Sequence, residues 1–272
     1  MVKQAIIPLA GLGTRLLPLS SVIPKELLPI NGKPNLEYIM DECIQAGIKQ
    51  FILVVPKNRP SIKKYFFNDN FYKKIIKKKK NDKRLREVFK RIKRYQKMIK
   101  FVYQNKPEGT GHAVLQCKKY LKGTHFLMLL ADDLIVKKNC SKEMISLHKK
   151  TKGSVIATRK VERKTVSRWG ILGYKNKTKN SFLINQVIEK PKLSEAPSNY
   201  AIIGRYILPK KILSVLKNQE RGKGGEIHIT DSIKTLIKKN EKFYGNIFKG
   251  KYIDCGTLDG FINSGILISK YL

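Results

Sequence analysis

The sequence predicts an α/β domain with a Rossmann-like mixed, mostly parallel sheet and helices on both faces. Short apolar runs rich in branched residues alternate with longer amphipathic segments, which is typical of parallel strands joined by helices. A chain of 272 residues, 42% of them apolar, can bury a sizeable core, so we expect a single domain over residues 1–272. The expected strands are Ala5–Leu9, Phe51–Val55, Ile99–Tyr103, Phe126–Leu130, Ser154–Thr158 and Ala201–Leu208, and the expected helices are Asn35–Ala46, Gly111–Lys118, Lys142–Lys150, Lys210–Leu216 and Asp231–Lys238.

The first expected strand leads directly into a glycine-rich turn, Gly11-Leu12-Gly13-Thr14-Arg15. Glycines after a buried strand let the backbone approach a ligand and direct successive N–H groups at one point, which favours an anion. Arg15 and Lys25 add side-chain charge for phosphate oxygens. The turn is neither a Walker loop nor a dinucleotide fingerprint, because it lacks Gly-Lys-Ser/Thr and a third glycine. For the glycine pair alone, a simple turn is the alternative.

Further short segments carry charged side chains, glycines or both. They are Pro24–Pro29, Gln104 with Gly109–Val114, Leu130–Asp133, Glu189–Lys192, Ala196–Tyr206, Glu226–Asp231 and Asp254–Gly256. In this order, after the glycine turn, they resemble the sugar nucleotidyltransferases, which join a nucleoside triphosphate to a sugar 1-phosphate. The Ala196–Tyr206 segment is similar to the uridylyltransferases within that family. The resemblance implies a nucleotidyltransferase (GT-A-like) fold and transfer of a uridylyl group from UTP to glucose 1-phosphate, giving UDP-glucose and pyrophosphate.

The implied reaction explains which side chains the site needs. A sugar-phosphate oxygen attacks the α-phosphorus of the triphosphate, so the protein supplies alignment and charge neutralisation rather than a nucleophile. Taken alone, Gln104 is also compatible with a loop amide, and Glu189-Lys190 with a surface ion pair. By matching position, the resemblance implies that Arg15, Lys25 and Lys190 are catalytic, that Ala10, Gly11, Gly13, Thr14, Glu26, Gln104 and Gly109 bind the nucleotide, and that Gly170, Glu189 and Lys190 bind the sugar.

Two aspartates are implied by the same resemblance to bind Mg²⁺. Asp132 follows the apolar run Phe126–Leu130, and Asp254 follows Tyr252-Ile253. We expect the two carboxylates to meet at the sheet edge beside the glycine turn, because carboxyl ends of parallel strands converge there. Magnesium accepts one or two carboxylates and completes its shell with phosphate oxygens and water. For Asp132-Asp133 the alternative is a turn or a helix cap.

The chain departs from the family pattern at several positions. Glu108 stands where many uridylyltransferases have Lys, Ala131 where they have Pro, and Gly225 where an acid is usual. These departures leave open a thymidylyltransferase or another transferase for a nucleoside triphosphate and a sugar 1-phosphate. A non-catalytic regulatory or polyanion-binding homologue is disfavoured by the retained charged residues, which are Arg15, Lys25, Asp132, Lys190 and Asp254.

The chain has a net charge of +37, and its densest basic patch lies in a segment near residues 68–98. Apolar residues recur there at helical spacing from Leu85 to Tyr95, which predicts an amphipathic surface helix with a basic polar face. Binding of nucleic acid or of a membrane surface is one interpretation of such a face. A solvated helix whose composition has drifted towards Lys is the interpretation we favour, so we do not expect nucleic acid as a partner.

Cysteine usage and hydropathy indicate a cytoplasmic protein. The four cysteines are scattered without a Cys-x-x-Cys pair, as expected for free thiols in a reducing compartment. The apolar run Phe126–Leu130 is ended by Asp132-Asp133, and no run reaches the length of a membrane span. We therefore expect no membrane partner.

The C-terminal tail near residues 257–272 is apolar for a chain end. An apolar tail avoids water either by docking on its own domain or by pairing with a second subunit. We therefore expect docking or a homo-oligomer, either a dimer or a tetramer.

Overall fold

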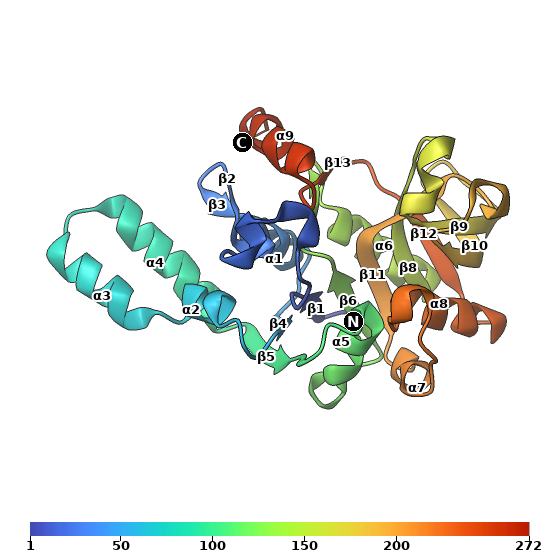
Figure 1. Cartoon of the computed structure of the whole chain (residues 1–272), viewed down its shortest axis with the longest axis horizontal. Helices are drawn as coiled ribbons and strands as arrows, with labels where there is room; N and C mark the ends of the chain where they lie inside the picture. Colours follow the sequence, from blue (N-terminus) through green and yellow to red (C-terminus); the bar gives the residue numbers. More distant parts are fainter. Residues whose placement is uncertain (272) are drawn as a thin grey trace.

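Branched apolar residues form the central strands of one nine-stranded sheet that extends across the molecule (Figure 1). The structure is a computed structural model, which describes residues 1–271. In spatial order the strands are β5 (Ile99–Tyr103), β4 (Gln50–Val55), β1 (Gln4–Pro8), β6 (His125–Leu129), β11 (Tyr200–Pro209), β8 (Ser154–Lys160), β12 (Phe243–Ile247), β10 (Ser181–Glu189) and β9 (Gly170–Lys175).

The sheet changes from parallel to largely antiparallel across its width. Strands β5, β4, β1 and β6 run parallel. Strand β11 is antiparallel to both of its neighbours β6 and β8, and β10 is antiparallel to β12 and β9. The predicted mixed α/β fold and all six expected strands are confirmed. The expectation of a mostly parallel sheet holds only for β5, β4, β1 and β6, because the expected strand β11 runs antiparallel to its neighbours and the antiparallel strands β10 and β9 were not recognised.

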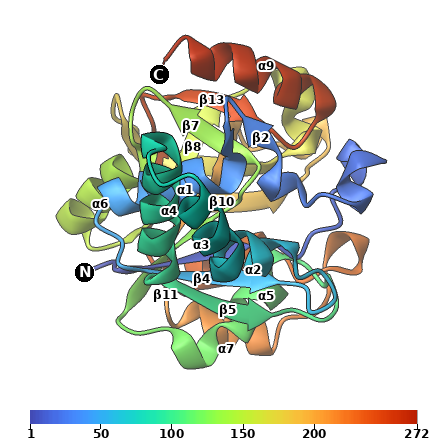
Figure 2. The ribbon, with the colours of Figure 1, turned by 90° about the vertical axis from the view of Figure 1, so that its left-hand side faces the viewer.

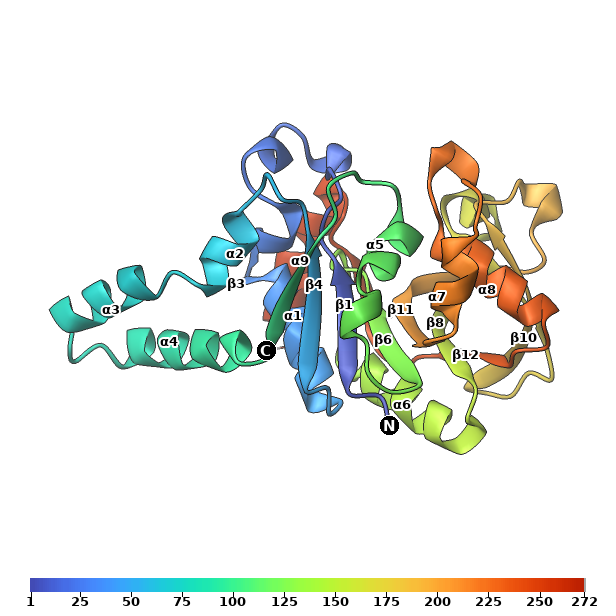
Figure 3. The same ribbon diagram turned by 90° about the horizontal axis from the view of Figure 1, so that it is seen from below.

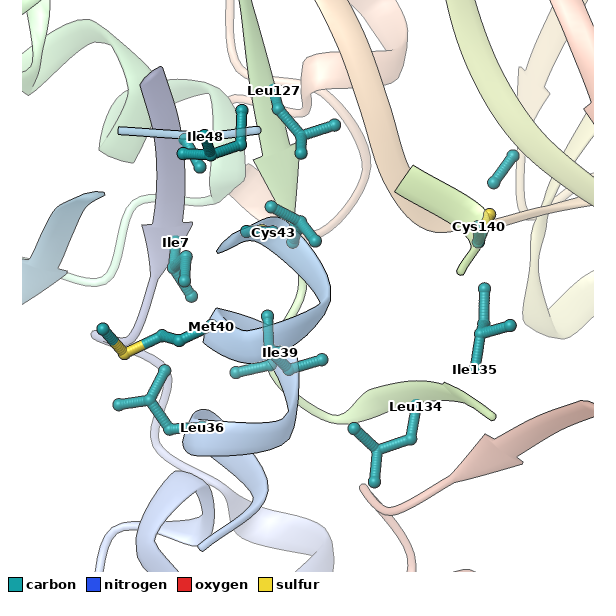
Figure 4. Close-up of a cluster of buried hydrophobic side chains, with 14 of the residues drawn as sticks. Ile7, Leu36, Ile39, Met40, Cys43, Ile48, Leu127, Leu134, Ile135 and Cys140 are labelled. Carbon is teal, nitrogen blue, oxygen red and sulfur yellow. The ribbon is translucent and has the colours of Figure 1, made fainter. Parts of the chain in front are cut away.

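Helices cover both faces of the sheet, as predicted. Alternate residues of β1 enter opposite cores: Ala5 and Ile7 pack on one side and Ile6 on the other. Helices α1 and α6 cover the first core, whose close packing around α1 is shown in Figure 4. Helices α5, α7 and α8 cover the second core. Their bounds are α1 (Asn35–Gln45), α5 (Thr110–Gln116), α6 (Cys140–Thr151), α7 (Ile212–Lys217) and α8 (Ile229–Lys238).

The basic segment forms a two-helix arm that projects from the body (Figures 1 and 3). We expected one amphipathic helix, but α3 (Asp69–Lys78) and α4 (Lys83–Gln96) are separated by a turn. The break has a local cause, since Asp82 caps α4 by accepting a hydrogen bond from Leu85 N at 3.0 Å. Ile92 and Tyr95 of α4 are buried against the body beside α2 (Ser61–Phe66), which anchors the base of the arm.

The C-terminal segment forms α9 (Leu258–Ser269), which docks on the body through buried Ser264 and Ile268. It follows β13 (Lys251–Asp254), which pairs antiparallel with β7 (Asp133–Val136) in a separate two-stranded ribbon (Figure 2). A second small ribbon joins β2 (Pro29–Ile30) to β3 (Lys33–Pro34). Among the described residues, none of the helices has the length and apolar character needed to cross a membrane.

A fully buried ion pair joins the sheet to α1. Arg205 of β11 has no exposed surface, and its Nη2 lies 2.9 Å from Glu42 Oε2. The other Glu42 oxygen accepts hydrogen bonds from Ser141 N at 3.0 Å and Ser141 Oγ at 2.6 Å. Because both charges are out of water, each depends on the other for compensation.

We predict that Glu42→Gln lowers the free energy of unfolding by about 3–5 kcal/mol, because Arg205 is left as an uncompensated buried cation. Urea denaturation of the two proteins measures this difference. Glu162→Gln is the matched control, since it opens an exposed pair with Lys164, 3.0 Å apart, and should change stability by less than about 0.5 kcal/mol. Equal losses in the two variants would contradict the prediction.

Candidate active site

The glycine turn after β1 forms a hollow at the carboxyl ends of the parallel strands. Gly13 has a φ of 67°, and a Cβ there would lie 3.1 Å from Ser20 Cβ, so only glycine fits without strain. Ser20 Oγ donates to Gly13 O at 2.8 Å and holds the turn closed. At Gly11 a Cβ would meet no atom within 4 Å, so its backbone is open to a ligand. Ala10 is buried beside the turn, and Thr14 is exposed.

Lys25 and Arg15 both contact the carboxylate of Asp132. We expected Asp132 to lie beside the glycine turn, which is where it is found. Lys25 Nζ lies 2.6 Å from Asp132 Oδ2, and Arg15 Nη2 lies 3.5 Å from the same oxygen. Burial disfavours ionisation of Asp132, but the charge and hydrogen bond of Lys25 outweigh it and lower the pKa of the carboxyl. Burial likewise opposes the charge on Lys25, and Asp132 outweighs it and raises the pKa of the ammonium. Asp132 and Lys25 therefore stabilise each other in their charged forms.

Asp254 reaches the same place by another route than expected. It ends β13, which belongs to the two-stranded ribbon and not to the main sheet. A backbone hydrogen bond from Cys255 N to Asp132 O, 2.8 Å long, ties this ribbon to the turn that follows β6. A Cβ on Gly256 would lie 2.7 Å from Arg15 Nη2, 2.8 Å from Asp132 Oδ2 and 3.2 Å from Asp254 Oδ1. The charged groups therefore converge on one small volume beside Gly256.

The donor set at this point fits a hard divalent cation. Asp132 and Asp254 offer two carboxylates, while the described residues include no group of three His, Cys, Asp or Glu side chains arranged for a metal. An incomplete oxygen shell suits Mg²⁺, which keeps water and substrate phosphate oxygens as ligands. Zinc sites of the structural kind need four protein ligands and do not match this arrangement.

A pocket of about 190 Å³ opens next to the two aspartates. Glu189 and Gly170 pair across β10 and β9, and a Cβ on Gly170 would lie 3.1 Å from Glu189 Oε2. Gly170 therefore keeps the pocket open over the Glu189 carboxylate. Trp169 also lines the pocket. Lys190 follows β10 and is exposed, and it is not among the described residues that line the pocket. The structure thus places Glu189 and Gly170 together with Asp132, and Lys190 beside them.

Gln104 and Gly109 lie together in the loop between β5 and α5. Gln104 Nε2 donates to Gly109 O at 3.2 Å, and Gln104 N donates to Val55 O at 3.0 Å. The φ of Gly109 is 99°, and a Cβ there would lie 2.7 Å from Ile227 O. Gly109 is therefore required by backbone packing, whatever ligand lies nearby.

Glu26 is buried under the glycine turn, in the hollow that Gly11, Gly13 and Lys25 also line. Burial raises the pKa of Glu26 from 4.5 to about 7, although the Lys25 charge opposes the shift. A carboxyl in this range can both donate and accept hydrogen bonds at neutral pH.

Sequence reasoning missed several residues of the site. Arg59 lines the hollow at the end of β4, next to the glycine turn at the end of β1. Its position after a parallel strand was the available signal. Tyr252 donates to Asp133 Oδ1 at 2.5 Å, and burial followed by the charge of Asp132 raises the pKa of Asp133 to about 7. Their pairing depends on the β7–β13 ribbon, which the sequence did not reveal.

Comparisons with known proteins agree with this geometry. The profile of the nucleotidyl transferase family matches residues 4–269, so the chain belongs to the nucleotidyl transferase family. A UTP–glucose-1-phosphate uridylyltransferase 2 of Staphylococcus saprophyticus is 36% identical over 268 residues, covering 97% of this chain and 91% of that protein.

Solved structures show the same likeness in three dimensions. The crystal structure of a UDP-glucose pyrophosphorylase complexed with UDP-glucose superimposes with a TM-score of 0.87 at 33% identity, covering 99% of each chain. A UTP-bound UGPase of Acinetobacter baumannii gives a TM-score of 0.88 at 32% identity, covering 98% of this chain and 93% of that one. The resemblance recognised in the sequence is thereby confirmed.

We predict that the stability gap between Glu26→Gln and wild type widens with pH. The folded ligand-free protein retains a proton on Glu26 that the unfolded chain has lost, so wild-type stability falls as pH rises from about 4.5 to about 7. Gln cannot ionise, so the stability of Glu26→Gln does not fall in this way. The difference in free energy of unfolding between variant and wild type should grow by on the order of 3 kcal/mol from pH 4.5 to pH 7 and then stay constant. Urea denaturation at pH 5, 6, 7 and 8 measures it, with exposed Glu220→Gln as control. Parallel stability curves for Glu26→Gln and wild type would contradict it.

Proposed function

We propose that the protein transfers the uridylyl group of UTP to glucose 1-phosphate and releases pyrophosphate. The proposal rests on four charged side chains that converge beside Gly256, close to the glycine turn. They are Arg15, Lys25, Asp132 and Asp254. Relatives and neighbours named for this reaction support it, because they match nearly the whole chain.

In the proposed reaction the chain provides positioning and charge. The open backbone at Gly11, in the turn that Gly13 closes, receives the triphosphate, and Lys25 and Arg15 neutralise oxygens around the α-phosphorus. These two cations are already held by Asp132, so little reorganisation is needed when phosphate enters. Glu189 accepts hydrogen bonds from sugar hydroxyls above Gly170, and Lys190 neutralises the sugar phosphate. Aligned in this way, the sugar-phosphate oxygen lies in line with the departing pyrophosphate.

We propose Mg²⁺ as the cofactor, held by Asp132 and Asp254. When bound, the ion adds positive charge at the phosphate oxygens of the substrate. Asp132 and Asp254 offer the ion two carboxylates, so we expect the nucleotide to complete the metal site, which should be weak without it.

UTP is expected to be the best triphosphate. With glucose 1-phosphate and Mg²⁺, pyrophosphate release should be fastest with UTP, and slower with dTTP at equal concentration. Faster turnover of dTTP would replace the uridylyl assignment with a thymidylyl one. The other class of function is polyanion binding through the arm. It would be supported if no triphosphate gave pyrophosphate release and if the protein bound DNA with an affinity that falls as salt rises.

Asp132→Asn is expected to lower turnover by roughly 10²–10³-fold while leaving the fold intact, because it removes charge from the centre of the site. Turnover against Mg²⁺ concentration, and direct Mn²⁺ binding by electron paramagnetic resonance in the presence of UTP, measure the effect. Asp69→Asn is the control, since it removes a carboxylate from a pair with Lys93 on the arm, with Oδ2 and Nζ 2.5 Å apart. Wild-type metal dependence in Asp132→Asn would remove this residue from the metal site.

We also propose a homo-oligomer formed through the outer face of α9. Leu258, Ile262 and Ile266 are 60%, 57% and 54% exposed and lie four residues apart, so they form one apolar stripe. Residues 258–269 contain no Lys or Arg in a chain that has 57, so two like-charged copies can approach at this surface.

Ile262→Lys should therefore shift the sedimentation coefficient to that of a monomer, because it places charge in the apolar stripe. Leu193→Lys, at another exposed apolar position, should leave the oligomer unchanged. A wild-type protein that sediments as a monomer at micromolar concentration would overturn this proposal.

The cytoplasm is the proposed location. Cys43, Cys117, Cys140 and Cys255 are all free and buried, which fits a reducing compartment. A disulfide detected in protein alkylated at cell lysis would contradict this location.

A further inference from the structure

Two contacts hold the Gln104 side chain in one orientation. Its amide group faces Gly109 O at 3.2 Å and His112 Nδ1 at 2.9 Å. A carbonyl oxygen can only accept, so the Gln104 atom that faces Gly109 O must be the nitrogen. The opposite rotamer would set two acceptor oxygens against each other. The two amide hydrogens are thereby used within the protein.

This orientation determines what Gln104 can offer a base. With both N–H groups occupied, Gln104 Oε1 is the atom left for a ligand, and it only accepts. A uracil or thymine ring donates from N3–H, whereas cytosine presents an acceptor at N3. The sequence alone suggested that Gln104 offers both a donor and an acceptor, and the structure narrows this to an acceptor.

His112 keeps the Gln104 amide in place only in one tautomer. To accept from Gln104, Nδ1 must be unprotonated, so a neutral ring carries its proton on Nε2. Glu108 Oε2 lies 3.3 Å from Nε2, so its negative charge favours a proton on that ring nitrogen. Gln116 Nε2 lies 2.8 Å from the same ring nitrogen, and when Nε2 carries the proton this amide must present its oxygen instead to bond the ring. The carboxylate thus selects the tautomer.

Glu108 is in turn fixed from the other side of the loop. Arg221 Nη2 bonds Glu108 Oε1, and Arg221 Nη1 donates to Gly225 O at 2.9 Å. The hydrogen bond from Arg221 lowers the pKa of Glu108 and keeps its acceptor charge. Ile227 N donates to Glu108 O at 2.9 Å, so backbone and side chain hold the same residue. A chain of contacts therefore runs from Arg221 to Gln104.

We propose that His112, supported by Glu108, is a positioning residue that presents Gln104 Oε1 to the base and so favours uracil over cytosine. The inference rests on the proposed function, because it takes the Gln104 loop as the base site. His112 does not act as an acid or base in the reaction. Its contribution is to prevent the amide from turning, since a turned amide would place a donor where cytosine has an acceptor.

The test compares discrimination rather than activity alone. The ratio of the CTP inhibition constant to the UTP KM is measured at fixed glucose 1-phosphate and Mg²⁺ for wild type, His112→Leu and Glu108→Gln. We expect the ratio to fall roughly tenfold in His112→Leu, as for one lost hydrogen bond, and roughly threefold in Glu108→Gln, where the tautomer is no longer selected. Glu241→Gln, which opens an ion pair with Lys211 away from the loop, should leave the ratio unchanged.

The outcomes separate this inference from the proposed function. Absence of UTP turnover in the wild type would overturn the proposed function. A wild type active with UTP, together with variants that keep the wild-type ratio, would overturn the positioning role alone. A variant that binds UTP and CTP more weakly by the same factor would also overturn it, because a merely structural defect does not distinguish the bases. Glu108→Gln lies at the loop surface, so it remains informative if His112→Leu fails to fold.

Discussion

The buried ion pair between Glu42 and Arg205 is the constraint on which the active-site edge depends. Arg205 also donates from Nη1 to Leu130 O at 3.3 Å, and Asn35 Nδ2 donates to the next carbonyl, Ala131 O, at 2.5 Å. Helix α1 therefore fixes the backbone directly before Asp132. Placing two charges in the interior is costly in free energy, and their benefit here is a rigid strand end rather than stability as such.

The same edge shows which parts of the site the sequence could reveal. Arg15 and Asp132 follow the parallel strands β1 and β6, so their meeting could be predicted from topology. Lys25 lies further along the connection after β1, and topology alone does not place it. Asp254 lies near Asp132 by another route than expected, because it arrives through the β7–β13 ribbon. The orientation of Gln104 could not be predicted, since it depends on hydrogen bonds between side chains that only the folded loop brings together.

The fold was predictable in proportion to the apolar content of its strands. β1, β4 and β6 are buried on both faces and read as continuous apolar runs. β10 has exposed Asn185 and Gln186 and a register shift between Ile184 and Gln186, so neither a run nor a strict alternation marks it. In the arm, helical periodicity was visible, but the cap at Asp82 that divides it was not recognised.

Gly256 supplies no functional group, yet the site is shaped around the volume it leaves empty. Even the methyl group of alanine would lie within 3.2 Å of Arg15, Asp132 and Asp254 at once. This methyl group would push the three charged side chains apart without altering any of their charges. In a saturation screen for activity, position 256 should therefore tolerate substitution as poorly as the charged positions around it, although it contributes only space.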